Sequence, residues 1–466
     1  MEWKNEKLKE FFSYIKNRKT AIIGLGVSNV PLLEYLYKLG AKITVFDNRN
    51  IDDIDKNILD KITDRNIEFS FGNNNLSKLN GFDIIFRSPT CRLDVPELIA
   101  EAERGAIITS EIEMLMELCP STIIGVTGSD GKTTTTSLIY EIVKKQGYNC
   151  YLGGNIGIPL FTKIEEMVPD DVVVLELSSF QLMNIKTSPQ IAVITNITPN
   201  HLDIHKSYEE YIEAKKNIFK YQNENGLVIL NYDNEITREA SKEAKGKVVF
   251  FSRNHKLADG VILDDGVIKI CKDKLRKHIL NTKDLMLKGV HNYENASCAI
   301  ATTMGIADME NQIDAITNFK GVKHRLEFVR EIDGVKWYND SIGSSPTRTI
   351  AGLKSFEENI VLIAGGYDKN LDYTPIAEPI LENVSTLILL GQTAGKIKNA
   401  VQQEAKKQNK NIDIYECDTL EETIKTAKRV AAKGEVVLFS PASASFDMYK
   451  NFEERGDKFK AIVNSL

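Results

Sequence analysis

Residues 123–134 read Ile-Ile-Gly-Val-Thr-Gly-Ser-Asp-Gly-Lys-Thr-Thr. An apolar, strand-like run leads into a glycine-rich turn and then into threonines that suit the start of a helix. Such a turn points successive backbone N–H groups at phosphate oxygens, and the helix N-terminus adds a positive dipole end. Lys132 is placed to reach the terminal phosphates of a nucleotide, and the Thr133 hydroxyl to bind Mg²⁺. The stretch predicts a phosphate-binding loop.

This loop departs from the usual pattern at one position. The usual loop has a glycine five residues before its Gly-Lys pair, whereas Val126 stands there in this chain. A glycine-rich turn that merely precedes a helix is the plainer alternative. The coincidence of strand, glycines, lysine and hydroxyl favours nucleotide binding.

Two polar groups follow apolar runs farther along the chain. Glu176 closes the run 171–177, and His201 follows the run 191–196. Ligands gather at the carboxyl ends of strands in open α/β sheets, so both side chains are expected near Lys132. Taken singly, Glu176 is typical of a solvated strand end and His201 of a structural histidine. Lys215, within a helical pattern, is by itself predicted to be an exposed helix lysine.

Apolar runs alternate with helical stretches along the whole chain, which predicts an α/β protein. The runs are 20–24, 42–47, 122–127, 171–177, 191–196, 360–364, 386–390 and 435–440. Unbroken Val/Ile/Leu runs of this kind suit strands that are buried on both faces. The length of 466 residues suggests about three domains. Breaks near Pro120 and Gly321 divide the chain into 1–118, 119–320 and 321–466.

The first segment contains a Rossmann-like turn. Its strand leads into the pattern G-x-G-x-x-N, which begins at Gly24, and the next strand ends at Asp47. This is the layout of a dinucleotide-binding turn with a ribose-binding acid, but Asn29 replaces the third small residue. The pattern predicts a pocket for a nucleotide diphosphate, of which NAD is one candidate.

Three strand-end loops in the last segment carry hydroxyls, a lysine and carboxylates. They are residues 339–341, 365–369 and 440–447. Together these side chains suit a small anionic substrate, although each one alone is typical of an ordinary loop.

Composition argues against several classes of protein. The net charge of -6 gives no support for a nucleic-acid partner. The six cysteines are scattered without a C-x-x-C pair, which favours reduced thiols over disulfides or zinc. The charged start does not suit a signal peptide, and we find no apolar run of membrane-spanning length. A cytoplasmic protein without membrane insertion is expected.

Taken together, these segments resemble the Mur ligase family. The match in the central part rests on residues 128–134, 153–157, 176–181, 200–203 and 288–295, followed by the junction 319–325. The match is ordered and covers nearly the whole chain. Residues 24–28, 339–341, 440–447 and 451–456 are similar to the branch of the family that adds D-glutamate.

The resemblance implies three α/β domains. These are a Rossmann-like domain for the UDP-linked substrate, a central phosphate-loop domain for ATP, and a Rossmann-like C-terminal domain for the incoming amino acid. It implies an ATP-dependent ligase that joins D-glutamate to UDP-N-acetylmuramoyl-L-alanine through an acyl phosphate, in peptidoglycan precursor synthesis. One or two Mg²⁺ ions and a CO₂-derived carbamate on Lys215 are implied as cofactors. A monomer is expected.

The resemblance also assigns roles to individual residues. Catalytic roles fall to Lys132, Glu176, His201 and Lys215, and the metal ligands are Thr133, Glu176, His201 and Lys215 as a carbamate. The residues assigned to ATP binding are Gly128, Ser129, Asp130, Gly131, Lys132, Thr133, Thr134, Asn292, Arg325 and Asp340. The residues assigned to the UDP-linked substrate are Val27, Ser28, Asp47, Arg49 and Asn155. The residues assigned to D-glutamate are Lys369, Ser445 and Phe452.

The chain departs from the family pattern at three places. Asp130 stands where asparagine is usual, Thr90 replaces a glycine, and Ile342 stands where the better-known pattern has a lysine. The alternatives are a Mur ligase for a different amino acid, an NAD-dependent dehydrogenase that uses the Gly24 turn, and a non-catalytic nucleotide-binding relative.

Overall fold

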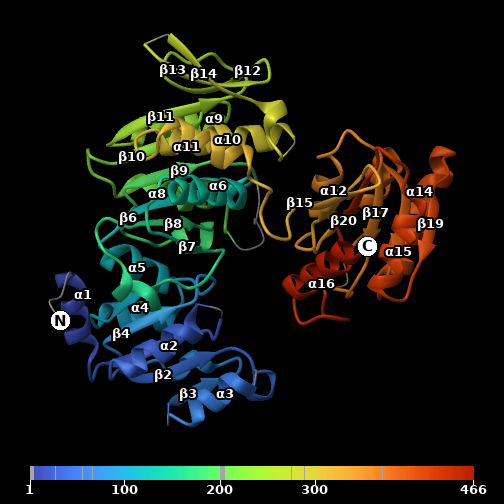
Figure 1. Cartoon of the computed structure of the whole chain (residues 1–466). Helices are drawn as coiled ribbons and strands as arrows, with labels where there is room; N and C mark the ends of the chain where they lie inside the picture. The colour runs from blue at the N-terminus through green and yellow to red at the C-terminus, as the bar shows by residue number, and fades with distance from the viewer. Residues whose placement is uncertain are drawn as a thin grey trace. The chain divides into compact units, whose positions relative to one another are not determined.

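The computed structural model describes residues 5–466 apart from residues 27, 55, 66, 200–204, 274, 288 and 370. It contains three β-sheets with helices packed against them (Figure 1). The chain divides into two compact units. Unit 1 comprises Met1–Asp284 and His291–Thr317, and unit 2 comprises Leu285–Val290 and Asn318–Leu466.

The first sheet of unit 1 has five parallel strands in the order β3-β2-β1-β4-β5. They are β1 Lys19–Ile23, β2 Lys42–Asp47, β3 Glu68–Phe71, β4 Ile84–Arg87 and β5 Ile107–Thr109. The helices are α1 Glu6–Ile15, α2 Asn29–Lys38, α3 Lys56–Thr63, α4 Pro96–Glu103 and α5 Glu111–Leu118. Ile22 lies in one core with Leu32 of α2, and Ile23 in another with Leu98 of α4. This strand order is that of a Rossmann fold up to its fifth strand, as expected.

The second sheet has nine strands in the order β14-β13-β12-β11-β10-β9-β6-β8-β7. They are β6 Thr122–Thr127, β7 Cys150–Gly154, β8 Val172–Glu176, β9 Ile191–Ile194, β10 Leu227–Asn231, β11 Lys247–Ser252, β12 Gly260–Asp264, β13 Val267–Lys272 and β14 Leu275–Asn281. The helices are α6 Lys132–Lys145, α7 Ser179–Leu182, α8 Tyr208–Lys220, α9 Glu235–Ala240, α10 Val290–Thr303 and α11 Met309–Thr317. Strands β6 to β12 are parallel, whereas β13 pairs antiparallel with β12 and with β14.

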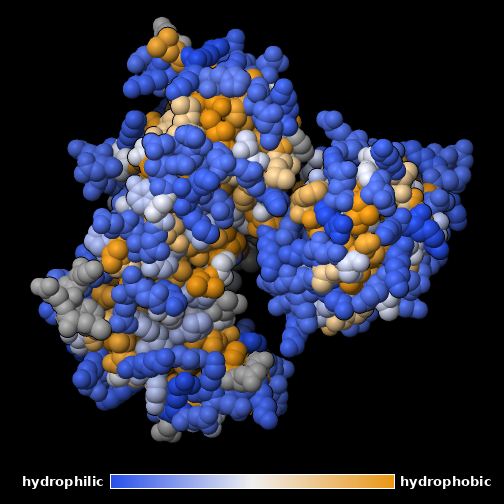
Figure 2. Space-filling view, in the orientation of Figure 1, coloured by the Kyte–Doolittle hydropathy of each residue, from blue (hydrophilic) through white to orange (hydrophobic). Residues whose placement is uncertain are grey.

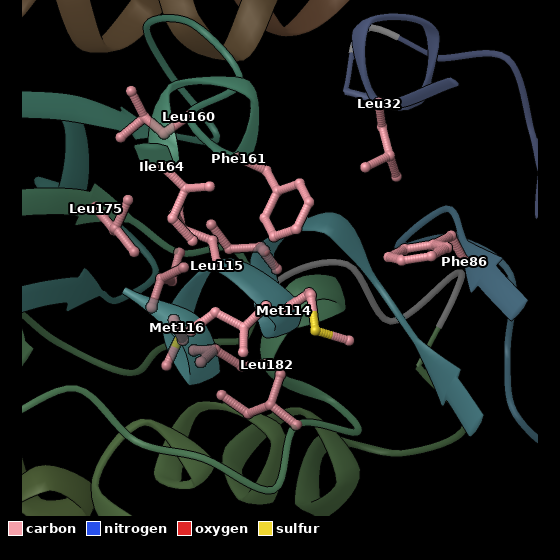
Figure 3. Close-up of a cluster of buried hydrophobic side chains, with 14 of the residues drawn as sticks. Leu32, Phe86, Met114, Leu115, Met116, Leu160, Phe161, Ile164, Leu175 and Leu182 are labelled. Atoms are coloured by element: carbon pink, nitrogen blue, oxygen red, sulfur yellow. The ribbon is translucent and has the colours of Figure 1, made fainter. Parts of the chain in front are cut away.

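One hydrophobic core joins these two sheets. Met114, Leu115 and Met116 of α5 belong to the same cluster as Phe161 and Leu175 from the second sheet region (Figure 3). The buried residues of α5 lie on most of its circumference, so the helix packs against neighbours on several sides. Shared burial of this size explains why both sheets form a single unit.

Unit 2 has one sheet with the order β15-β16-β20-β17-β18-β19, parallel except for β15. Its strands are β15 Glu327–Ile332, β16 Val335–Asn339, β17 Ile360–Ala364, β18 Val384–Leu389, β19 Asp413–Glu416 and β20 Val436–Phe439. Its helices are α12 Pro346–Leu353, α13 Ala377–Asn383, α14 Ala394–Gln408, α15 Leu420–Val430 and α16 Phe452–Ser465. Leu362 faces a core with α12, α13 and α14, and Ile363 faces a core with α15 and α16. Helices therefore cover both faces.

The expected fold class is confirmed, because every apolar run named above forms a strand of one of three α/β sheet regions. All six cysteines are free thiols. Hydrophilic residues cover most of the visible face of each unit (Figure 2). Among the described residues, no helix combines the length and the apolar character that a membrane span requires.

Candidate functional site

The phosphate loop lies between β6 and α6. Gly128 and Gly131 have φ of 151° and 77°, a region that residues with a Cβ rarely adopt. A Cβ on Gly131 would also collide with the side-chain oxygen of Asn295. The Lys132 Nζ donates to the carbonyl oxygens of Gly128 and Ser129, each at 2.9 Å. The side chain therefore folds over the loop and holds its ammonium against the carbonyls.

The loop is anchored by its own polar groups. The backbone N–H groups of Ser129 and Asp130 donate to the carbonyl and the side chain of Asn196. The Ser129 hydroxyl contacts the Tyr211 hydroxyl at 2.8 Å and the Thr198 carbonyl at 2.9 Å. Through these contacts the Ser129 side chain holds the loop against α8. The first N–H groups of α6 have no partner within the helix, and N–H groups at a helix start are suited to bind an anion.

Glu176 ends β8 beside the phosphate loop, since it pairs with Val126 in the register of β6 and β8. The residue is 1% exposed. Its Oε1 accepts from Asn155 Nδ2 at 2.8 Å, whereas its Oε2 is buried without a hydrogen-bond partner among the described residues. A buried carboxylate oxygen without a donor is costly, and a hard divalent cation compensates it well. Asn155, assigned to the UDP-linked substrate, here orients this carboxylate.

Lys215 is buried, with 1% exposure, so the prediction of an exposed helix lysine was wrong. The inner face of α8 packs under the phosphate loop, and Lys215 lies on that face. Its Nζ donates to the Gly128 carbonyl at 2.8 Å and lies 4.6 Å from the centre of the Tyr211 ring. Burial, followed by repulsion from the Lys132 ammonium, lowers the pKa of Lys215 well below its usual value. Both effects disfavour the charged ammonium form of this side chain.

Two predicted residues, Val27 and His201, lie outside the described residues, as does the segment 200–203. Within the described part of the chain, no group of three or more His, Cys, Asp or Glu side chains is arranged for a metal ion. The position of His201 relative to Glu176 therefore stays a prediction.

The start of α10 contributes two asparagines next to the phosphate loop. Thr135 Oγ1 donates to Asn295 Oδ1 at 3.3 Å, and Asn295 Nδ2 donates to Asn292 Oδ1 at 3.4 Å. Asn292 was assigned to ATP, whereas Asn295 was not singled out. The signal was present in the sequence, because residues three apart share one face of a helix.

The Gly24 turn of the first sheet is held by Asp47. Its carboxylate accepts from the Leu25 N–H at 2.7 Å and from Arg49 Nε and Nη2 at 2.9 and 2.8 Å. Burial works to raise the pKa of Asp47, but these hydrogen bonds outweigh it and lower the pKa. Both carboxylate oxygens of Asp47 thus accept hydrogen bonds from the chain itself. In a dinucleotide-binding site, the corresponding acid would accept hydrogen bonds from the ribose hydroxyls. Asn29 Nδ2 donates to the Ile23 and Gly24 carbonyls, which explains the asparagine in the turn.

Ser28 precedes α2 as its N-terminal cap residue, and its side chain makes no capping hydrogen bond. The structure therefore places Ser28 at the start of the helix that follows the Gly24 turn, as the pattern predicts.

In unit 2, Asp340 follows β16 and is 4% exposed. Its carboxylate accepts from Ser440 Oγ at 2.6 Å and from the Leu326 N–H at 3.3 Å. Burial raises the pKa of Asp340 to about 6, against the attraction of Arg325. Arg325 lies between two residues with left-handed backbone, His324 (φ 65°) and Leu326 (φ 43°). Such strain persists where surrounding contacts enforce it, and it is frequent at functional sites.

The three residues assigned to D-glutamate also lie in unit 2. The Lys369 Nζ is 5.4 Å from the centre of the Phe446 ring, next to the buried Ser445. Phe452 begins α16, and its carbonyl accepts from Ser341 Oγ at 2.8 Å.

Arg455 connects these loops and was missed by the sequence reasoning. It is 3% exposed and donates to the Ala444 carbonyl at 2.8 Å, to the Ser341 carbonyl at 2.8 Å and to Ser341 Oγ at 3.1 Å. Burial lowers its pKa to about 10. Ile342, which stands where the family pattern has a lysine, is half-buried, and its N–H donates to the His324 carbonyl.

Comparisons with known proteins match three consecutive parts of the chain. Residues 18–110 match the MurD-like N-terminal domain of Mur ligases, residues 126–303 the Mur ligase middle domain, and residues 324–443 the glutamate ligase domain of Mur ligases. A protein of Acetivibrio thermocellus called UDP-N-acetylmuramoylalanine–D-glutamate ligase is 52% identical over 464 residues, 99% of each chain. One of the same name from Clostridium acetobutylicum is 49% identical over 459 residues, 98% of each chain.

Solved structures share the fold at low sequence identity. The UDP-N-acetylmuramate–alanine ligase of Thermotoga maritima has a TM-score of 0.58 at 19% identity and covers 96% of this chain and 100% of its own. The MurF ligase of the same organism, solved with ADP, has a TM-score of 0.55 at 16% identity and covers 97% of each chain. The chain therefore belongs to the Mur ligase family, within its branch of UDP-N-acetylmuramoylalanine–D-glutamate ligases.

Proposed function

We propose that this chain is an ATP-dependent ligase that joins D-glutamate to UDP-N-acetylmuramoyl-L-alanine, the reaction that its relatives are named for. The observation that carries the proposal is the group around the Gly128 carbonyl. Two lysines, Lys132 and Lys215, donate to that oxygen, and Glu176 ends the neighbouring strand with one carboxylate oxygen that lacks a donor. Phosphoryl transfer requires this combination of cations and a metal-binding acid.

The proposed domains follow the sequence boundaries. Residues 1–118 bind the UDP-linked substrate, residues 119–320 bind ATP, and residues 321–466 bind the incoming amino acid. The core that joins the first two sheets supports treating them as one rigid platform for the two phosphorylated substrates. We place the reaction in the cytoplasm, where ATP and nucleotide-linked precursors occur, and propose that the chain acts as a monomer.

The reaction needs activation because a carboxylate is a poor acyl electrophile. The γ-phosphoryl group of ATP passes to the L-alanine carboxylate, which breaks the bond to ADP and forms an acyl phosphate. The D-glutamate amine then attacks the acyl carbon, and inorganic phosphate leaves with the C–O bond electrons. Lys132 and the first N–H groups of α6 hold the phosphoryl oxygens during the first transfer.

A divalent cation fits the residues at the phosphate loop. The Glu176 oxygen without a donor and the Thr133 hydroxyl are hard oxygen ligands, and His201 completes the set that the family resemblance implies. When bound, Mg²⁺ offsets charge on the phosphate oxygens. The depressed pKa of Lys215 supports a carbamate there, because an uncharged amine adds to CO₂ and releases one proton.

In this proposal other residues hold the two remaining substrates. Ser28, Asp47 and Arg49 shape the turn that receives the UDP part, and Asn155 supports Glu176. Lys369 and Ser445 offer a cation and a hydroxyl to the carboxylates of D-glutamate, with Phe452 at the start of α16. Asn292, Arg325 and Asp340 are proposed to line the ATP site.

The test measures phosphate release by the purified full chain. UDP-N-acetylmuramoyl-L-alanine, ATP and Mg²⁺ are supplied with each member of a panel of D- and L-amino acids. Release is expected with D-glutamate and to fall by a factor of about 10² to 10³ in Lys132→Ala, which loses the phosphate-binding cation. Faster release with another amino acid would assign a different ligase, and a nicotinamide absorbance change would assign a dehydrogenase.

A further inference from the structure

A network of ion pairs links a loop of the first sheet to the start of helix α8. Arg92, on the loop after β4, donates from Nη2 to Glu210 Oε1 at 2.7 Å and from Nη1 to Glu210 Oε2 at 3.2 Å. The same guanidinium donates from Nε to Asp94 at 3.1 Å. The two N–H···O bonds from one guanidinium to one carboxylate form in a single relative orientation of the two groups. This pair therefore fixes the orientation of Arg92 and Glu210 as well as the distance between them.

Lys206 closes the network on its other side. Its Nζ lies 2.5 Å from Asp94 Oδ2, and its backbone N–H donates to Glu210 Oε2 at 2.7 Å. The Arg92 and Glu210 side chains are 24% and 27% exposed, so water screens them only in part. The hydrogen bond from Arg92 lowers the pKa of Glu210 to about 2, which keeps the pair ionised at neutral pH.

On one side, the loop that carries Arg92 follows β4 and packs against the Gly24 turn. The Ser88 N–H donates to the Ile23 carbonyl at 2.9 Å, and a Cβ on Gly24 would lie 3.1 Å from Ser88 Cβ. The buried Arg87 donates to the Cys91 carbonyl at 3.0 Å and so holds the loop from within. The loop that carries Arg92 is therefore packed against the turn proposed for the UDP-linked substrate.

On the other side, Glu210 lies in the first turn of α8. Its neighbour Tyr211 contacts the Ser129 hydroxyl at 2.8 Å, and Lys215 donates to the Gly128 carbonyl at 2.8 Å. The network therefore lies at the N-terminal end of α8. The same helix carries Tyr211 and Lys215, which contact the phosphate loop.

We propose that Arg92 is a positioning residue, which through Glu210 sets α8 relative to the first sheet and thereby places the Lys215 side chain at the phosphate loop. The inference rests on the proposed function and adds to it a residue that was assigned to none of the substrates. Residues that orient metal ligands from outside typically change metal affinity or activity by 10- to 100-fold when they are removed. The expected consequence of losing Arg92 is weaker Mg²⁺ use rather than weaker binding of the amino acid, whose proposed site lies in unit 2.

The experiment compares wild type, Arg92→Ala, Glu210→Ala and the double variant as full chains. Steady-state assays give kcat, KM for each substrate and the Mg²⁺ concentration for half-maximal rate, and calorimetry measures Mg²⁺ binding in the presence of ADP. Arg92→Ala is expected to raise the half-maximal Mg²⁺ concentration and the calorimetric Mg²⁺ dissociation constant about tenfold, with KM for D-glutamate unchanged. The double variant should match the single variants, because both remove the same pair.

Lys216→Ala is the matched control. Lys216 lies on the same helix and pairs with Glu213 at 2.6 Å and Glu243 at 2.5 Å, without reaching the first sheet. It should leave Mg²⁺ use unchanged. Arg92→Lys, which keeps the charge without the fork, should show a smaller shift than Arg92→Ala, and it tests the inference should Arg92→Ala fail to fold.

An unchanged Mg²⁺ dependence in the Arg92 variants, an equal shift in Lys216→Ala, or additive effects in the double variant would each overturn the inference. Failure of the proposed function would give a different experimental result. Wild type would then release no phosphate with the three substrates, while the calorimetric titration would still report whether Arg92 affects binding of the metal with ADP.

Discussion

Burial changes the chemistry of single side chains at this site. Lys132 and Lys215 donate to the same Gly128 carbonyl, but only Lys215 is buried to 1% exposure. Desolvation disfavours its charged form, and the nearby Lys132 ammonium adds repulsion. Two lysines that contact one oxygen atom thus differ in burial, and burial disfavours the ammonium form of Lys215.

The proposed carbamate on Lys215 can be tested directly. In ¹³C-labelled bicarbonate, wild type is expected to show one carbamate carbon resonance, which Lys215→Arg lacks because a guanidinium stays protonated. The pKa of Lys215 is lowered, so the amine is uncharged above that pKa and is protonated as pH falls through it. The resonance and the activity are therefore expected to decline together on acidification. Persistence of the resonance in Lys215→Arg, with Lys216→Arg as control, would refute the assignment.

At the scale of elements, apolar runs in the sequence predicted eight of the strands. The runs 42–47, 122–127 and 360–364 form β2, β6 and β17 with the same bounds. The antiparallel strands β13 and β14 were not predicted. Four of the seven residues of β14 are exposed, so this strand lacks the continuous apolar run that marks a buried parallel strand.

Helix α5 contains a buried acid whose titration affects stability. Glu111 accepts from the Phe161 N–H at 2.9 Å, and burial raises its pKa from 4.5 to about 7. The folded state therefore holds a proton that the unfolded chain releases. The resulting stability is fully present below pH 4.5 and is lost as pH rises to about 7. Glu111→Gln, which stays neutral, should avoid that loss and exceed wild type at pH 8 by about 1 to 3 kcal/mol.

Urea unfolding at pH 5 and pH 8 measures this difference. Glu117→Gln, at an exposed position of the same helix, is the matched control and should behave as wild type at both pH values. An equal fall in stability for wild type and Glu111→Gln between the two pH values would show that another group is responsible.

At the scale of the whole molecule, the side chains proposed to bind the substrates and the metal are divided between the two units. Lys132, Glu176 and Lys215 belong to unit 1, whereas Arg325, Asp340 and Lys369 belong to unit 2. A reaction among three substrates requires the groups of both units to meet in one water-poor site. Closure of unit 2 on unit 1 during turnover is therefore expected.

Small-angle scattering tests the closure. An ATP analogue together with the UDP-linked substrate is expected to reduce the radius of gyration of wild type. Lys132→Ala, which is impaired in nucleotide binding, should show a smaller reduction at the same ligand concentrations. Identical profiles with and without ligands would exclude a large closing motion.

Local patterns were sufficient to infer the phosphate loop and the strands that end at Glu176 and Asp47, and the resemblance of ordered segments indicated the family. Strand periodicity, turn glycines and helix starts depend on neighbouring residues, so they can be read along the chain. The burial of Lys215, the Glu176 oxygen without a donor and the Arg92–Glu210 pair could not be inferred in this way. They arise where segments far apart in the chain pack together, and packing sets which polar groups lose water and which partners remain for them.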